Sequence, residues 1–158
     1  MKKRISILFI LSIIFISCNN NDNEYKQYYE FFKSNELKIP IIEASIGTEK
    51  FGFIVDSGAN ISLIDSTWYS KNSHLFKNEG TSEIWITGVS GIVKSNTTII
   101  SSDLNNSLTY FSTSDLRPVL NALQEQKITV IGILGSEYLQ HHNLVIDYYK
   151  QSIYSGKE

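Results

Sequence analysis

The sequence predicts a mostly β domain with two or three short helices, and three observations support this prediction. Short apolar runs interrupted by Gly, Asn and Ser fill the chain from residue 36 onward, which is typical of short strands joined by turns. Residues 128–134, ITVIGIL, are continuously apolar, as expected of a strand buried on both faces. Residues 83–100 alternate apolar and polar side chains around a Gly-Val-Ser-Gly stretch, which predicts a hairpin. We therefore assign residues 36–158 to one folded domain.

The composition limits the kinds of function that this chain can have. It has 158 residues, a net charge of −2 and one cysteine. The near-neutral charge gives no electrostatic reason to expect a nucleic acid partner. A single cysteine excludes an internal disulfide and a cysteine-rich zinc site. The adjacent His141 and His142 would point in different directions on a helix or a strand, so we expect neither a metal site nor a cofactor.

Turn-forming residues divide the first half of the domain into its expected elements. Pro40 has no N–H to donate, so its strand is either at a sheet edge or starts there. Asp65 or Ser66 is expected to cap a brief helical turn. In chain order we expect a strand over 37–46, a turn over 47–50, strands over 51–55 and 62–64, a helical turn through residue 69, and a polar loop over 71–80.

The second half of the domain is expected to combine strands with two short helices. Pro118 fits the first turn of a helix, and Ser136 is expected to cap another. After the hairpin over 83–100, we expect a strand over 108–111, a helix over 115–126, the buried strand over 128–134, a helix over 137–142, and closing strands over 144–149 and 153–154.

Residues 1–17 have the composition of an export signal. A basic start, KKR at 2–4, is followed by an apolar run over 5–16 that is short for a membrane span. Cys18, the only cysteine, comes almost directly after this run. The stretch resembles a bacterial lipoprotein signal, which implies a lipid on Cys18 and a mature protein anchored to a membrane of the cell envelope. The alternative is an ordinary secretory signal followed by an incidental cysteine.

Residues 18–35 are predicted to link this anchor to the domain. The run NNNDNE over 19–24 is polar and has no apolar periodicity. The segment 24–34, EYKQYYEFFKS, carries aromatic residues near helical spacing. It is therefore expected to be either a short helix packed on the domain or part of the linker.

The stretch 53–62, FIVDSGANIS, holds the candidate catalytic group. An apolar strand delivers Asp56 into a tight turn, where Gly58 permits backbone conformations that a Cβ would block. A carboxylate with apolar flanks in this position is expected at the floor of a cleft. The ordinary alternative is a turn in which Asp-Ser-Gly plays only a structural part.

Three segments together resemble the retropepsin-like aspartic proteases. FIVDSGANISLID over 53–65 is similar to their catalytic loop, ITGVSGIVK over 86–94 to their glycine-rich flap, and VIGILGSEYL over 130–139 to their later apolar strand and helix. The order and rough spacing also agree. The resemblance implies the acid-protease fold, a closed β-barrel protomer with a flap hairpin and short helices.

The resemblance also implies a reaction and an assembly. In this family two aspartates share one proton and activate a water that cleaves a polypeptide. Of the six aspartates only Asp56 precedes Ser-Gly or Thr-Gly, so the second must come from another copy in a two-fold homodimer. By resemblance, Ser57 would bond across the dimer, Gly58 would let the two loops approach, and Ala59 would offer backbone groups to substrate. The flap would be formed by Gly88, Val89, Ser90 and Gly91.

Two other functions are compatible with the same residues. A lipoprotein of this fold could bind extended peptides without cutting them. An envelope binding protein of an unrelated β fold is the second alternative. The sequence names no substrate, and it leaves open which face of the membrane the protein occupies.

Overall fold

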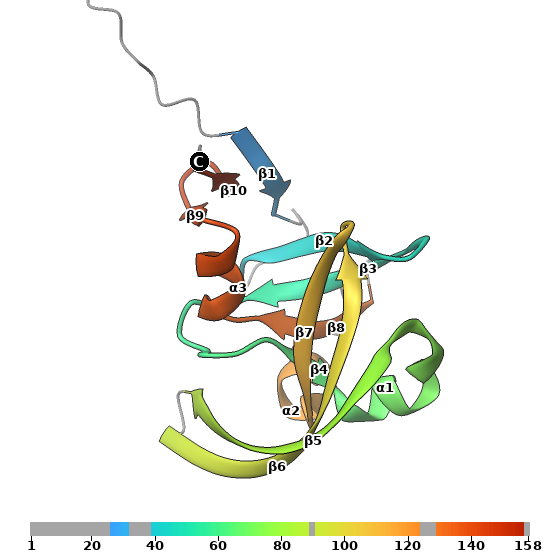
Figure 1. Ribbon diagram of the computed structural model, residues 1–158. Helices are drawn as coiled ribbons and strands as arrows, with labels where there is room; N and C mark the ends of the chain where they lie inside the picture. Colours follow the sequence, from blue (N-terminus) through green and yellow to red (C-terminus); the bar gives the residue numbers. More distant parts are fainter. Residues whose placement is uncertain (1–25, 32–38, 89–90, 124–128, 157–158) are drawn as a thin grey trace, which may run out of the picture.

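The computed structural model describes residues 26–31, 39–88, 91–123 and 129–156, and these residues are mostly in strands (Figure 1). A seven-stranded sheet has the strand order β2-β3-β8-β4-β7-β6-β5, and a three-stranded sheet has the order β1-β10-β9. The larger sheet consists of β2 (Ile41–Ile46), β3 (Glu49–Val55), β4 (Leu63–Asp65), β5 (Lys77–Gly88), β6 (Gly91–Leu104), β7 (Ser107–Ser114) and β8 (Val130–Leu134).

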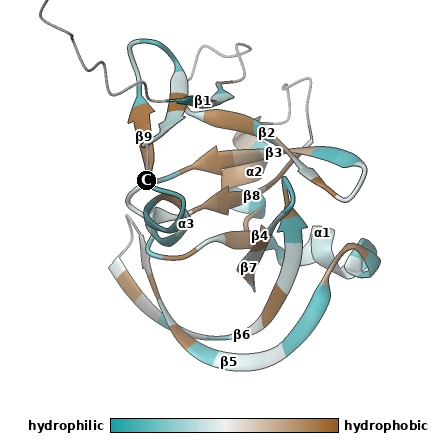
Figure 2. Cartoon of the chain, turned by 45° about the horizontal axis from the view of Figure 1, so that its top comes forward, coloured by the Kyte–Doolittle hydropathy of each residue, from teal (hydrophilic) through white to brown (hydrophobic). Residues whose placement is uncertain are grey.

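The larger sheet closes into a barrel where β2 meets β6. Ile46 pairs with Leu104, Ser45 accepts a bond from the Asn105 N–H at 2.9 Å, and its own N–H donates to Asn105 Oδ1 at 2.7 Å. Pro40 lies just before β2, so the expected strand start is confirmed. Figure 2 shows that the central strands β2, β3, β8 and β4 are mostly hydrophobic, whereas β5 and β6 mix hydrophilic and hydrophobic residues. The expected closed barrel is therefore present.

Strand β8 lies between β3 and β4, parallel to the first and antiparallel to the second. Four successive residues, Ile131 to Leu134, are buried, which confirms the expectation drawn from ITVIGIL. A Cβ on Gly132 would lie 2.3 Å from the Leu63 carbonyl oxygen, so only glycine lets these two strands approach so closely. Strand β8 thus joins β3, which precedes Asp56, to β4, which follows the Asp56 loop.

The three-stranded sheet joins the two ends of the described chain. It consists of β1 (Lys26–Glu30), β9 (Leu144–Asp147) and β10 (Ser152–Ser155). The expectation of a helix or a linker over 24–34 is wrong for β1, because pairing with β10 overrides the helical spacing of its aromatic residues. Tyr29 and Phe31 are buried in the barrel core, and Tyr29 Oη lies 2.8 Å from Tyr138 Oη.

The helices are short, and those of the described residues include none long and apolar enough to cross a membrane. Of the two residues expected to cap the first helix, Asp65 is the cap and Ser66 starts the helix. Ser136 is not a cap: the residue at the N-cap is Gly135, and Ser136 starts the last helix. The expected loop over 71–80 already holds a 3₁₀ turn and the start of β5. The expected helix over 115–126 reaches Leu123, and its last residues lie outside the described part. The helices are α1 (Ser66–Lys71), η1 (Ser73–Leu75), α2 (Arg117–Leu120), η2 (Asn121–Leu123) and α3 (Ser136–His141).

Candidate active site

Asp56 lies directly after β3, where the buried strand meets solvent. The Val55 N–H donates to the Pro40 carbonyl at 2.8 Å, and the Asp56 N–H donates to the Leu134 carbonyl at 3.0 Å. The backbone of Asp56 is thus held by β8, while its side chain is exposed. A carboxylate at this position is fixed in place and open to a reacting partner.

The turn after Asp56 is closed by the aspartate itself. The Gly58 N–H donates to Asp56 Oδ1 at 2.8 Å, and the Ala59 N–H donates to the Asp56 carbonyl at 3.2 Å. A Cβ on Gly58 would lie 3.2 Å from Asp56 Oδ1, which is tighter than usual. Glycine therefore leaves room on this side of the carboxylate, and the neighbouring Ser57 is exposed and able to meet another chain.

The backbone groups of Ala59, which were expected to face the substrate, are hydrogen-bonded inside the protomer. Its N–H donates to Asp56, and its carbonyl accepts from the Ser136 N–H at 2.8 Å, so both backbone groups are engaged within the protomer. Its side chain is buried beside Ile54, Leu63 and other apolar residues. Ala59 therefore uses both its backbone groups and its methyl group in contacts inside the protomer.

The far end of the loop is held by residues that the sequence analysis did not single out. The Gly135 N–H donates to Ser62 Oγ at 3.1 Å, and the Ser62 N–H donates to Glu137 Oε1 at 2.9 Å. The Ser62 carbonyl accepts from the Ser112 N–H at 3.0 Å. Ser62 is 1% exposed, and its bond to the Gly135 N–H is buried, whereas its bond to Glu137 is part-buried. A polar residue inside the apolar run after Asp56 was the one sequence signal for this role.

A long hairpin made of β5 and β6 confirms the one predicted from the sequence. Gly88 pairs with Gly91, whose φ of +105° is a conformation that favours glycine. Val89 and Ser90, the expected tip, lie outside the described residues. Asn60 Nδ2 donates to the Trp85 carbonyl at 3.0 Å, so the hairpin is bonded to the loop that carries Asp56.

An apolar cluster includes residues of the Asp56 loop, of this hairpin and of the helical segment after β7. Ala59 comes from the loop, Ile86 from the hairpin, and Leu116, Leu120 and Leu123 from the helical segment after β7. The remaining members come from strands or their ends, namely Ile39, Ile41, Ile54, Ile61, Leu63, Val130 and Ile133. The candidate site therefore has an apolar wall on the side of the helical segment.

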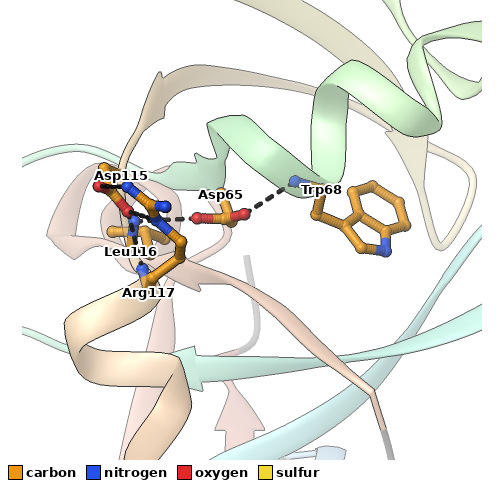
Figure 3. A network of polar contacts seen from close by, with 5 residues as sticks. All are labelled: Asp65, Trp68, Asp115, Leu116 and Arg117. Carbon is orange, nitrogen blue, oxygen red and sulfur yellow. Dashed lines mark hydrogen bonds and ion pairs between the residues drawn. The ribbon is translucent and has the colours of Figure 1, made fainter.

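Asp65 anchors this helical segment and is not a second catalytic aspartate. Its Oδ1 accepts from the Trp68 N–H at 2.8 Å, and its Oδ2 accepts from the Leu116 N–H at 3.0 Å (Figure 3). It is only 4% exposed, so both oxygens are occupied inside the protein. The nearby Asp115 is exposed, and its bonds to the Arg117 side chain and N–H lower its pKa to about 2.

The adjacent His141 and His142 lie in contact with each other and with aromatic neighbours. Within the described part of the chain, no three His, Cys, Asp or Glu side chains form a group that could hold a metal ion. The rings of His141 and His142 are edge to face at 4.9 Å, and His142 packs on Tyr138 at 4.5 Å. These histidines therefore serve packing in this structure. Cys18, the expected lipid site, lies outside the described residues.

The chain is similar to known proteins in both sequence and fold. Residues 37–147 match the family model described as retroviral aspartyl protease. The chain belongs to this family. Among solved structures, EIAV protease complexed with the inhibitor HBY-793 is 20% identical, with a TM-score of 0.44 over 70% of this chain and 93% of that one. No curated protein matches the chain.

Membership of the retroviral aspartyl protease family confirms the predicted fold class. The matched residues include β3, the Asp56 loop, the β5–β6 hairpin, β8 and α3. They exclude β1 and β10, which lie outside the match on either side. The three-stranded sheet is thus completed by segments that the family model does not cover.

Proposed function

We propose that this protein is an aspartic endopeptidase whose active form is a two-fold homodimer. The observation that supports this most directly is the placement of Asp56: its backbone is fixed by β8, and its carboxylate is exposed at the end of a buried strand. Among the described residues only Asp56 lies in an Asp-Ser-Gly turn, and Asp65, the next aspartate, is buried with both oxygens bonded. The second carboxylate comes from a second copy, which fits the family to which the chain belongs.

The proposed reaction uses the two Asp56 carboxylates with one proton shared between them. The ionised carboxylate takes a proton from water, and the water oxygen attacks the carbonyl carbon of the scissile peptide bond. The protonated carboxyl donates to the carbonyl oxygen as it gains charge. The tetrahedral species collapses when the leaving nitrogen takes a proton, which releases a carboxylic acid and an amine. Two carboxylates in contact cannot both ionise, so the dimer itself creates the acid and the base.

The residues around Asp56 receive roles in this proposal. The exposed Ser57 bonds to the partner's loop, and Gly58 leaves space for the two loops to meet. The β5–β6 hairpin, with Gly88 to Gly91 at its end, closes over the substrate and excludes water. The apolar cluster beside Ala59 favours apolar side chains next to the bond that is cut.

Replacement of the proposed nucleophile-activating group tests the activity. Asp56→Asn keeps the shape of the side chain but leaves no carboxylate to take a proton, so peptide hydrolysis should fall by at least about 10³-fold. Asp103→Asn, at an exposed aspartate on β6, is the matched control and should keep full activity. A wild-type protein that binds extended peptides but never cleaves them would support the non-catalytic alternative.

We also propose that the protein is a lipoprotein of a bacterial cell envelope, attached through Cys18. The support is the basic and apolar composition of residues 1–17 and the position of the only cysteine directly after them. Cys18→Ala should leave the chain unprocessed or move it to the soluble fraction. An unchanged mass of the mature protein and an unchanged membrane fraction in this variant would refute the anchor.

A further inference from the structure

The hairpin formed by β9 and β10 carries an exposed aromatic surface. Of the nine large apolar or aromatic side chains that are exposed among the described residues, four belong to the three-stranded sheet and its turn. Tyr149, in the turn, is 96% exposed, its neighbour Tyr148 is 61% exposed, and Val145 on β9 is 48% exposed. We call Val145, Tyr148, Tyr149 and Lys150 the hairpin patch.

The fold holds the hairpin patch on the outside of the molecule. Ile153 of β10 is fully buried, and its partner Ile146 of β9 packs against the barrel core. The next pair, Val145 and Tyr154, therefore points to the opposite face. The Tyr148 ring packs edge to face against Phe31 at 6.1 Å, which fixes the direction of the turn. Within the part of the chain that the structure describes, this face stays open at Val145, which is 48% exposed.

The proposed active site gives the hairpin patch no role. The match to the protease family ends at residue 147, so Tyr148, Tyr149 and Lys150 follow the matched part of the chain. In both Figure 1 and Figure 2 the three-stranded sheet lies at the opposite end of the molecule from the β5–β6 hairpin. The patch is therefore on the side away from the proposed flap.

The chemistry of the hairpin patch suits the boundary between lipid and water. Tyrosine places an apolar ring beside a polar hydroxyl and is enriched where acyl chains meet headgroups. Lys150 Nζ lies 5.2 Å from the Tyr154 ring centre and 4.0 Å from an Asp147 oxygen, yet its side chain stays 62% exposed. A lysine beside such rings is attracted to anionic headgroups.

The length of the preceding chain allows the patch and the proposed lipid to reach one surface. Cys18 is eight residues before Lys26, where β1 starts, and eight extended residues span at most about 28 Å. Glu30, at the other end of β1, pairs with Ser152 beside the turn. It lies about 13 Å from Lys26 at the usual rise of a strand. The maximum span of the eight residues between Cys18 and Lys26 is thus longer than β1, which separates Lys26 from the hairpin turn.

We propose that the hairpin patch docks on the membrane surface as a second attachment beside the lipid on Cys18. This inference rests on the lipid anchor proposed above. Docking orients the barrel, because the attachment through Cys18 alone sets only a maximum distance from the bilayer. The three-stranded sheet faces the lipid, and the β5–β6 hairpin with the Asp56 loop opens toward the aqueous compartment, where polypeptide substrates are.

A fluorescent label at position 149 tests the docking in the full chain. Lipidation of Cys18 occupies its thiol, so the cysteine introduced by Tyr149→Cys is the one free thiol for a solvent-sensitive dye. The membrane-purified protein is reconstituted into vesicles of phosphatidylethanolamine and phosphatidylglycerol. Tyr110→Cys, on β7 and 53% exposed, is the matched control. We expect the label at 149, and not at 110, to shift to the blue and to be quenched by lipids spin-labelled near the headgroup.

Each other result overturns the proposal in a distinct way. If the protein floats with the vesicles but the label at 149 emits as in water, the lipid anchor stands and the docking is wrong. If the label shifts to the blue without quenching by spin-labelled lipids, the patch contacts a second protein copy instead. If the protein does not float with the vesicles, the anchor itself is absent and both proposals fail.

Discussion

Gly135 lies so close to the Ile61 carbonyl that a Cβ atom at position 135 would be 2.5 Å from its oxygen. The same atom would be 3.0 Å from the Ala59 carbonyl oxygen. These obstacles are backbone atoms of the loop that carries Asp56, so they cannot move without moving the loop. The close approach lets the Gly135 N–H and the Ser136 N–H reach Ser62 and Ala59.

Gly135→Ala is expected to destabilise the protein, because the added methyl group must push the Asp56 loop away from β8. The free energy of unfolding should fall by about 3 kcal/mol, as measured by urea denaturation. Ser136→Ala, at the next position, removes only a half-buried hydroxyl and should cost less than about 1 kcal/mol. Equal losses in the two variants would show that the contact with Ile61 is not the cause.

Asp65→Asn is expected to loosen the helical segment that lines the candidate site. The amide nitrogen cannot accept a hydrogen bond, so either the Trp68 or the Leu116 N–H loses its acceptor in a buried place. The free energy of unfolding should fall by about 2 kcal/mol in urea denaturation. Asp115→Asn removes an exposed ion pair with Arg117 and should change it little.

Activity is expected to depend on assembly, since each protomer carries one Asp56. On dilution below the dimer dissociation constant, peptide hydrolysis should fall faster than in proportion to concentration. Mixed dimers with one Asp56→Asn subunit should be nearly inactive, because one carboxylate cannot supply both the base and the acid. Constant specific activity in a sample that sedimentation shows to be monomeric would contradict the shared site.

The pH dependence of hydrolysis is expected to reflect the alanine at position 59. The methyl group of Ala59 donates no hydrogen bond to a carboxylate, whereas a serine there could favour the ionised form. We expect optimal hydrolysis at about pH 5 to 7 in the wild-type protein and at lower pH in Ala59→Ser. A wild-type optimum below about pH 4, or identical profiles for the two proteins, would contradict this explanation.

Stability is expected to fall in mild acid because of His142. Burial, and then the charge of the adjacent His141, lowers the pKa of His142, so the unfolded chain binds this proton more readily than the folded protein. The contribution of neutral His142 is present above about pH 6.5 and is lost as the pH falls through the lower folded-state pKa. The thermal midpoint should drop between pH 7 and 5, and by less in His142→Phe, which keeps a ring beside Tyr138.

The sequence predicts the strands well because their apolar runs are local signals. The buried strand β8, the β5–β6 hairpin and the turn at Asp56 all depend on patterns within ten or twenty residues. By contrast, β1 contains aromatic residues near helical spacing and becomes a strand only because β10 pairs with it. That pairing joins residues more than a hundred positions apart, as Lys26 with Ser155.

The sequence predicts the turn at Asp56 but not the residues that hold this turn in place. The Gly58 N–H bond to Asp56 Oδ1 is the turn geometry that Asp-Ser-Gly favours. The support by Ser62, Gly135 and Glu137 depends on how β8 and α3 return to the loop, and no spacing in the sequence encodes such a contact. The engaged backbone of Ala59 has the same origin, since its carbonyl partner is contributed by α3.

Because β8 lies between β3 and β4, the Asp56 loop can reach its final conformation only late in synthesis. The Asp56 loop takes its final shape only when the Leu134 carbonyl and the Gly135 N–H arrive, about eighty residues after Asp56 has been synthesised. A chain that is still emerging from a ribosome or a translocation channel therefore holds Asp56 without the frame that fixes it. If the protein cleaves peptides as proposed, it cannot do so until nearly the whole domain has been synthesised.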